Sequence, residues 1–311
     1  MQCIYGGIIL KSNVLITVFT PTYNRGYIIE NLYKSLKKQV YLNFEWLVID
    51  DGSTDNTEEL FKTWILEDNN FNIRYIKVEN GGKPRAINKA LQLAQGKYLF
   101  MVDSDDYIVN DATLKLETWI KEIDDMDDIV AVGAAKVYPN GEYIKGVEPD
   151  IDDNIGYLDA TNLERKNYNL DADMCEAYKI DIMKKFPFIV WEGEKFSPEE
   201  IVLNEMALHG YKVRWHKDKI YMCDYLEDGL TKGNWGLLKS NPMGYAMMWN
   251  HKLKFEKGLY NRFNCCCQHI ALSIIGKEYG YIFKSNAKLL NIFALPFGIV
   301  LSIRRKHQFK K

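Results

Sequence analysis

Two aspartates one residue apart follow an apolar run near residue 100. The run 98–102 predicts a buried strand, and Asp103 and Asp105 come directly after it. Two carboxylates at a point where the backbone leaves extended geometry can converge on one hard divalent cation. Such a cation can bridge to a diphosphate and neutralise charge on a phosphate leaving group. Asp is also common in turns, where it binds backbone N–H groups, so the pair alone leaves a structural role open.

Three other polar side chains follow apolar runs in the same way. Asp51 ends the run 44–50 and could bind a nucleobase or ribose, or serve only the turn that it opens. Tyr23, two residues after Pro21, could stack on a base, although a core position fits it nearly as well. Lys83 follows two glycines and opens a predicted helix, so its ammonium and the positive helix end together suit a phosphate; a solvated surface lysine is the alternative.

The elements that must position these side chains alternate along the first third of the chain. Strands that alternate with helices and are continuously apolar indicate an α/β fold, with a mostly parallel central sheet and helices on both faces. The carboxyl ends of parallel strands meet at one edge, so we expect the polar segments to meet there. Pro21 is expected to end the first strand. The expected strands are 14–19, 44–50, 73–78 and 98–102, and the expected helices contain the apolar stripes 28–36, 60–65 and 86–94.

The second half of the chain is less regular. It predicts a strand at 129–138, a hairpin turn at Asn140-Gly141, a strand at 174–178 and a helix at 197–209. From about residue 234 the chain is rich in aromatic residues, Met and Lys in helix-like stretches. We therefore predict a catalytic domain over 1–233 and a helical C-terminal extension over 234–311.

Composition excludes several classes of protein. The 311 residues carry 40 Lys and Arg against 42 Asp and Glu, which argues against a nucleic-acid binder. No GxGxxG follows the first two strands and no GxxxxGK[ST] occurs, so Rossmann dinucleotide enzymes and P-loop NTPases are disfavoured. Three of the six cysteines are adjacent and none forms a CxxC pair, which predicts buried, reduced thiols in a cytoplasmic protein. We find no signal peptide, and the apolar stretch 289–303 is shorter than the roughly 20 residues that a membrane span needs.

Four motifs, in their order and spacing, resemble those of family 2 glycosyltransferases of the GT-A fold. The resemblance is strong over about the first third of the chain. The motifs are Pro21-Thr-Tyr-Asn-Arg25, Val48-Ile-Asp-Asp-Gly-Ser-Thr-Asp55, Asn80-Gly-Gly-Lys83 leading into Ala86 and Asn88, and Val102-Asp-Ser-Asp-Asp106.

The resemblance implies a nucleotide-diphosphate-sugar donor, with UDP favoured, and transfer with inversion by direct displacement. It implies that Pro21, Tyr23 and Asp51 hold the base and that Lys83 approaches the diphosphate. It further implies that Asp103 serves the ribose and, together with Asp105, binds Mg²⁺ or Mn²⁺.

The family also implies a general base from an acidic pair at a later helix start. Pro198-Glu199-Glu200 resembles that pair, and we favour Glu200 modestly over Glu199 as the base. The alternative is structural, because Ser197 and Glu200 also have the spacing of a capping box. The segment 225–231 resembles one that often follows this helix in bacterial polysaccharide-type members.

The C-terminal tail 289–311 joins an apolar stretch to a basic cluster. This composition suits either an anionic membrane surface or a helix docked on the catalytic domain. We predict an inverting, metal-dependent glycosyltransferase of surface-polysaccharide assembly, cytoplasmic or peripheral on the inner membrane face, with a saccharide or lipid-linked saccharide acceptor. Two alternatives remain, a sugar-phosphate nucleotidyltransferase and a non-catalytic nucleotide-sugar-binding protein of the same fold. The nucleotidyltransferase would be expected to carry a glycine-rich phosphate loop after the first strand, which this chain lacks.

Overall fold

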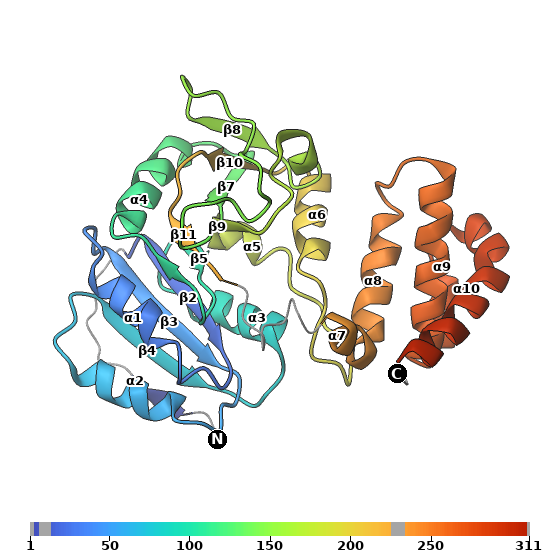
Figure 1. Ribbon diagram of the computed structural model, residues 1–311, viewed down its shortest axis with the longest axis horizontal. Helices are drawn as coiled ribbons and strands as arrows, with labels where there is room; N and C mark the ends of the chain where they lie inside the picture. The colour runs from blue at the N-terminus through green and yellow to red at the C-terminus, as the bar shows by residue number, and fades with distance from the viewer. Residues whose placement is uncertain (1–2, 6–13, 225–233, 310–311) are drawn as a thin grey trace. The chain divides into compact units, whose positions relative to one another are not determined.

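The computed structural model describes residues 3–5, 14–224 and 234–309, with the backbone alone for residues 3–5 and 234. The chain divides into two compact units (Figure 1). Unit 1 comprises Met1–Pro187 and Asn204–Asp224, and unit 2 comprises Phe188–Leu203 and Tyr225–Lys311. The segment 225–231, which resembles a family motif, lies outside the described residues. The division at residue 233 stays a prediction.

Within the described residues, unit 1 is built on a nine-stranded sheet with the order β1-β4-β3-β2-β5-β9-β7-β10-β8. Strands β4, β3, β2 and β5 are parallel neighbours. Strand β9 is antiparallel to both β5 and β7, so β7 runs in the same direction as β5 and ends at the same edge. The strands are β1 Cys3–Tyr5, β2 Ile16–Thr22, β3 Phe44–Asp50, β4 Asn72–Lys77, β5 Tyr98–Met101, β7 Ile129–Ala135, β8 Tyr157–Ala160, β9 Met174–Lys179 and β10 Lys212–His216. A second, two-stranded sheet pairs β6 Tyr107–Ile108 with β11 Tyr221–Met222.

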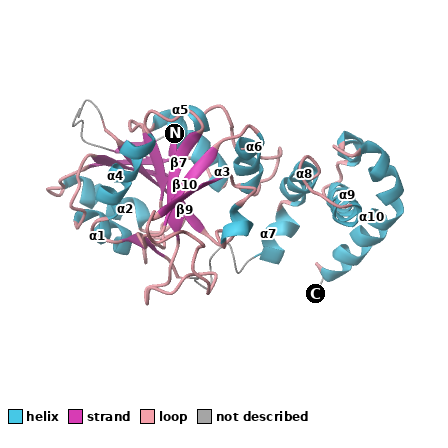
Figure 2. Cartoon of the chain, turned by 90° about the horizontal axis from the view of Figure 1, so that it is seen from above, coloured by secondary structure: helices cyan, strands magenta, loops and turns pink. Residues whose placement is uncertain are grey.

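Helices cover both faces of the large sheet. Helices α1, α2 and α4 lie on one face and α3 on the other (Figure 2). The first face holds an aromatic core in which Tyr33 stacks on Trp64 with ring centroids 4.4 Å apart. The centroid of the fully buried Trp46 ring lies 6.1 Å from that of Tyr33 and 6.2 Å from that of Trp64. The helices of unit 1 are α1 Glu30–Lys37, α2 Thr57–Leu66, α3 Lys83–Leu93, α4 Ala112–Ile123, η1 Arg165–Tyr168 and α5 Ile180–Met183. The predicted α/β fold, with its mostly parallel sheet, is confirmed.

Pro21 does not end the first strand, contrary to the sequence prediction. The Phe19 carbonyl accepts a hydrogen bond from the Val102 N–H at 2.9 Å, so the backbone of Phe19 faces β5. Pro21, two residues on, faces the same side, but β5 pairs with β2 only as far as Phe19 and Met101. The missing proline N–H therefore leaves no ladder bond unmade, and β2 continues to Thr22 beside β3.

Unit 2 is helical in its described residues. Its helices are α7 Asn234–Ser240, α8 Pro242–Lys252, α9 Leu259–Ile275, η2 Tyr279–Lys284 and α10 Lys288–Gln308, and it also contains the start of α6 Glu200–Leu208. The buried Glu194 carboxylate accepts hydrogen bonds from the Met243 and Gly244 N–H groups, at 2.7 and 2.8 Å, and so caps the first turn of α8. Among the described residues, five cysteines are free and buried, as predicted. No helix among the described residues has the length and apolar character to cross a membrane.

Candidate active site

Asp51 joins the end of β3 to the loop that follows β4. Its backbone follows β3, and its two carboxylate oxygens accept hydrogen bonds from the Gly81 and Gly82 N–H groups at 2.7 and 2.8 Å. Its carbonyl also accepts from Asn80 Nδ2 at 2.7 Å. Gly52 makes this approach possible, since its φ is +84° and an added Cβ would lie 3.1 Å from the Asn80 nitrogen. The carboxylate therefore orders the loop that opens α3.

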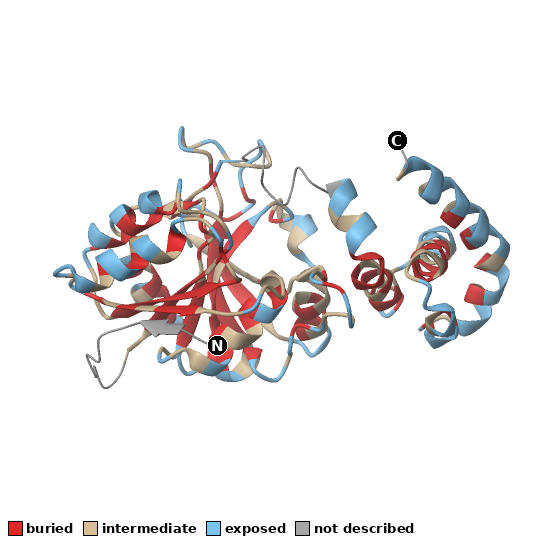
Figure 3. Cartoon of the chain, turned by 90° about the horizontal axis from the view of Figure 1, so that it is seen from below, coloured by how far each residue is buried: buried red, intermediate tan, exposed pale blue. Residues whose placement is uncertain are grey.

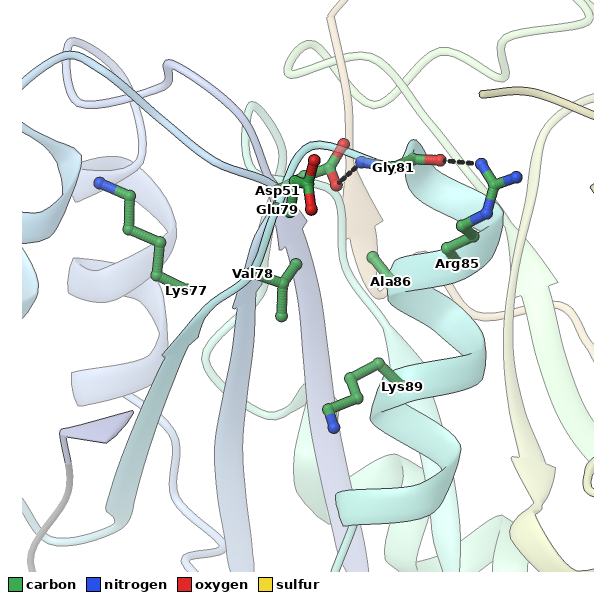
Figure 4. A pocket seen from close by; sticks show the side chains of 8 residues that line it. All are labelled: Asp51, Lys77, Val78, Glu79, Gly81, Arg85, Ala86 and Lys89. Carbon is green, nitrogen blue, oxygen red and sulfur yellow. Dashed lines mark hydrogen bonds between the residues drawn. The ribbon is translucent and has the colours of Figure 1, made fainter. Parts of the chain in front are cut away.

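A pocket of about 380 Å³ lies beside this loop. Figure 4 shows Asp51 at its rim, hydrogen-bonded to Gly81, with Arg85 of α3 donating to the Gly81 carbonyl at 2.6 Å. This volume lies in the range of small-ligand sites. The lining residues are Asp51, Lys77, Val78, Glu79, Gly81, Arg85, Ala86 and Lys89.

Lys83 connects the start of α3 to the end of β5. Its ammonium lies 2.8 Å from Asp103 Oδ1, and its side chain is 20% exposed. The loops after β2 and β3 are joined as well, because the Asn24 N–H donates to Ser53 Oγ and the Thr54 N–H donates to Asn24 Oδ1, both at 2.8 Å. The structure therefore brings together the four predicted polar segments at one edge of the sheet.

A lysine that is only 13% exposed contacts two of the aspartates. Lys136 follows β7, and its ammonium lies 3.3 Å from Asp103 Oδ2 and 3.5 Å from Asp106 Oδ2. The same ammonium lies 4.3 Å from the ring centroid of Tyr221. The Tyr221 hydroxyl accepts from the Asp103 N–H at 2.9 Å and donates to Asp106 Oδ2 at 2.7 Å. Lys136 and Tyr221 together fix the positions of Asp103 and Asp106.

The three aspartates have different electrostatic environments. Burial acts to raise the pKa of Asp103, but Lys83 and Lys136 outweigh it and hold that pKa below its ordinary value. Burial and the charge of Asp103 raise the pKa of Asp105. Burial raises the pKa of Asp106 to about 7, although Lys136 opposes the shift. Burial acts to lower the pKa of Lys136, yet Tyr221, Asp103 and Asp106 keep it well above its ordinary value.

The donor set of Asp103 and Asp105 fits a hard divalent cation. Both groups offer carboxylate oxygens, and no ion pair joins Asp105 to another residue in the described part of the chain. A cation would offset the burial and the charge of Asp103, which together raise the pKa of Asp105. The described residues contain no group of three or more His, Cys, Asp or Glu side chains around a common metal position. A cation here would take its remaining ligands from a diphosphate and water.

The other predicted donor residues lie at the end of β2. Tyr23 is 49% exposed, which removes the alternative of a core tyrosine and leaves its ring accessible to a base. Pro21 is partly buried in the strand.

Glu199 and Glu200 belong to unit 2. Glu200 is the first residue of α6, its side chain is 38% exposed, and its Oε1 lies 3.9 Å from the ammonium of Lys252. Glu199, which precedes the helix, is partly buried. Among the described residues no hydrogen bond joins the Ser197 hydroxyl to Glu200, so the capping box is not formed; the hydroxyl donates to the Ile189 carbonyl at 2.6 Å. The capping role that competes with a catalytic role for Glu200 therefore loses support.

Three side chains of the site were missed from the sequence as functional candidates: Asp106, Lys136 and Tyr221. Lys136 follows a strand that ends at the same edge as β5, so the rule that located Asp103 could have found it. Tyr221 lies in a two-residue strand, and its sequence carries no comparable signal.

The family model for glycosyl transferase family 2 matches residues 17–185, which cover the sheet edge with all four motifs. The chain belongs to this family. The resemblance inferred from the motifs is therefore confirmed.

Two curated relatives are bacterial glycosyltransferases. The glycosyltransferase GlyG of Streptococcus pneumoniae is 26% identical over 216 residues, which are 67% of this chain and 70% of that protein. The putative teichuronic acid biosynthesis glycosyltransferase TuaG of Bacillus subtilis is 38% identical over 92 residues, which are 30% of this chain and 36% of that protein. The match to the second relative thus spans about a third of its length.

Two solved structures share the fold. The structure of S. aureus TarS 1–349 in complex with UDP-GlcNAc has a TM-score of 0.62 at 18% identity, covering 95% of this chain and 91% of that one. The mannosyltransferase PcManGT from Pyrobaculum calidifontis, in complex with GDP-Man and Mn²⁺, has a TM-score of 0.55 at 18% identity, covering 93% and 74%. At these identities the comparison establishes the GT-A fold and its C-terminal helices.

Proposed function

We propose that this family 2 enzyme transfers a sugar, with inversion, from a nucleoside-diphosphate donor to a hydroxyl of a saccharide or lipid-linked saccharide. One observation carries the proposal: the Lys83–Asp103 ion pair joins the loop of the Asp51 pocket to the aspartate pair at one sheet edge. The motif resemblance and the name of TuaG support a role in surface-polysaccharide assembly. The buried free cysteines fit a reducing compartment such as the cytoplasm.

The pocket is proposed to receive the nucleoside. Asp51 and Arg85 supply polar groups of opposite charge at its wall. Tyr23 and Pro21 do not line the pocket but lie at the end of the neighbouring strand β2, and the exposed Tyr23 ring is proposed to stack on the base, with Pro21 as a further contact. The diphosphate is proposed to lie at the start of α3, where backbone N–H groups and the Lys83 ammonium favour an anion. UDP is the favoured nucleotide, since TarS binds UDP-GlcNAc in a similar fold.

Asp103 and Asp105 are proposed to hold Mg²⁺ or Mn²⁺. When bound, the cation neutralises negative charge on the diphosphate. The complex of PcManGT with GDP-Man and Mn²⁺ supports this assignment. Lys136 keeps Asp103 ionised, and Tyr221 holds the backbone of Asp103 in place.

The transfer step needs a base for the acceptor. The acceptor oxygen forms a bond to the anomeric carbon while the bond from that carbon to the diphosphate oxygen breaks, and the hydroxyl proton passes to a carboxylate. We assign that carboxylate to Glu200, which is accessible and free of the capping role. Glu199 is the alternative base.

Calorimetry with UDP, GDP and dTDP, each with and without Mn²⁺, tests the donor site. We expect one nucleotide to bind, and to bind more tightly with Mn²⁺, because a bare diphosphate is repelled by two carboxylates. Asp105→Asn should remove the Mn²⁺ dependence. Equal affinity with and without the ion, in the unsubstituted protein, would exclude the metal assignment.

Glu200→Gln should lower acceptor-dependent turnover by about 10²- to 10⁴-fold while leaving nucleotide affinity unchanged. The matched control is Glu192→Gln, which neutralises an exposed acid of the same unit. Nucleoside-diphosphate release and calorimetry supply the two readouts. A full rate for Glu200→Gln beside an inactive, folded Glu199→Gln would move the base to Glu199.

The family assignment favours glycosyl transfer over nucleotidyl transfer. A non-catalytic donor-binding protein is the remaining alternative. It would bind nucleotide sugar without releasing nucleoside diphosphate in the presence of any acceptor.

A further inference from the structure

Helix α10 packs against α9 with its small and polar residues. Its buried positions are Asn291, Ala294, Gly298 and Ser302, which recur every three or four residues on one face. An added Cβ on Gly298 would lie 2.5 Å from Cγ2 of Ile270 in α9, so the two helices approach closely at this point. The fully buried positions of α10 are thus small or polar residues, which let the two helices approach closely, and partly buried leucines flank them.

Seven large apolar side chains of α10 are exposed, while Leu290, Leu295 and Leu301 pack against the core that α10 shares with α9. The exposed fractions of the seven reach 77% at Leu289 and 72% at Phe293. Phe297 lies at the edge between the two faces, because its ring also contacts Phe263 of α9 at a centroid distance of 5.3 Å. Figure 3 shows α10 as mostly exposed, with few buried positions. A surface helix in water has the opposite pattern, and an exposed apolar patch of this kind marks an interaction site. The outer face of α10, as we define it, consists of Leu289, Ile292, Phe293, Phe297, Ile299, Val300 and Ile303.

The segment that contains α10 carries a net positive charge, whereas the rest of the chain is net negative. No Asp or Glu follows Glu278, whereas seven of the 40 Lys and Arg do, so residues 279–311 carry +7 and residues 1–278 carry −9. Lys288, Arg304 and Lys306 are exposed at the two ends of the outer face. Arg305 is different, because it is partly buried and donates to Gln268 Oε1.

We propose that unit 2 binds the surface of an anionic lipid membrane through the outer face of α10. The apolar side chains enter the interface, and the exposed cations at both ends meet anionic headgroups. The helix lies along the surface and does not span it, in keeping with its composition. Pairing two copies through this face would bring two strongly basic segments together, so charge complementarity favours the lipid.

Co-sedimentation with phosphatidylcholine vesicles, with and without phosphatidylglycerol, tests the proposal without any donor or acceptor. The full chain should bind the phosphatidylglycerol vesicles more tightly, and salt should release part of it. The triple variant Ile292→Ser, Phe293→Ser, Val300→Ser should lose binding to both kinds of vesicle. The double variant Arg304→Ser, Lys306→Ser should lose roughly fivefold in affinity per charge, on phosphatidylglycerol vesicles only.

The matched control is Val40→Ser, Leu66→Ser, which removes two exposed apolar side chains from unit 1 and should sediment like the unsubstituted protein. Far-UV circular dichroism and thermal unfolding, measured in parallel, show that each variant is folded, including the helices of unit 2. Unchanged vesicle binding by the triple variant would overturn the proposal. So would a protein that ignores vesicles and forms a dimer that the triple variant abolishes, because a second copy would then cover the outer face.

Discussion

At the scale of single residues, Asp103 and Asp105 differ in the charges that surround them. Asp103 is held between two lysines, Lys83 and Lys136, which keep it ionised. Asp105 forms no ion pair among the described residues, and burial and the charge of Asp103 raise its pKa although Arg25 and Lys136 act to lower it. Asp105 therefore gains most from an added cation, while Asp103 is already stabilised by the protein itself.

Lys136→Met should lower the free energy of unfolding by about 3–5 kcal/mol near neutral pH, since it removes a largely buried cation that lies within 3.5 Å of two carboxylates, Asp103 and Asp106. Lys83→Met removes an ammonium from the Asp103 carboxylate alone, so its cost should be smaller. Denaturant unfolding of both variants measures the difference. Equal losses would show that the second carboxylate does not set the contribution of Lys136.

Much of this site can be predicted from the sequence, because its side chains follow the carboxyl ends of parallel strands, which meet at one edge of the sheet. Asp51, Lys83 and Asp103 end or follow parallel strands, and the structure joins them through the Gly81–Gly82 loop and the Lys83–Asp103 pair. The sequence could not show that Asp51 binds backbone N–H groups, since that contact spans 30 residues and depends on the turn at Gly52. Tyr221 reaches Asp103 from 118 residues away, and no local pattern encodes such a contact.

At the scale of elements, the predictions were best where each strand is buried on both faces. The strand 44–50 was predicted to the residue, because β3 is a central strand with every position buried. Strand β8 was missed, since it pairs at the end of the sheet order with only its last residue buried. Helix α4, which carries the buried Trp119, was also missed. Tertiary packing, more than local pattern, fixes these later elements.

The contact between β10 and α4 should make stability depend on pH. His216 stacks on Trp119 with ring centroids 4.1 Å apart, and burial lowers the pKa of His216 to about 4. The unfolded chain, with a histidine pKa near 6.5, binds the proton more tightly, so stability is lost as pH falls through this window. The loss from this group is about 3 kcal/mol between pH 6.5 and 4.

His216→Phe keeps the stacked ring and removes the titration. Its unfolding free energy should therefore fall less than that of the unsubstituted protein as pH drops from 6.5 to 4, as followed by urea unfolding at several pH values. His209→Phe, at an exposed position, is the control. Parallel pH profiles for His216→Phe and the unsubstituted protein would contradict the assignment.

At the scale of the whole molecule, the two units differ in charge and in the surfaces they offer. Unit 1 gathers aspartates and lysines at a sheet edge, where opposite charges neutralise one another around a proposed polar ligand. Unit 2 ends in a segment that is wholly cationic among its charged residues and exposes large apolar side chains. The first arrangement suits a soluble nucleotide, and the second suits a lipid surface.

If the donor site lies at the sheet edge, nucleotide binding should protect four separate stretches of sequence together. With Mn²⁺ and whichever of UDP, GDP and dTDP binds, amide hydrogen exchange should slow in residues 21–26, 51–54, 80–85 and 103–106. These loops lie far apart in sequence but are joined by the Asn24–Ser53, Asp51–Gly81 and Lys83–Asp103 contacts, so ordering one should order the rest. Peptides from α9 serve as the internal reference. Nucleotide binding by calorimetry without protection of these four stretches would place the donor site elsewhere in the chain.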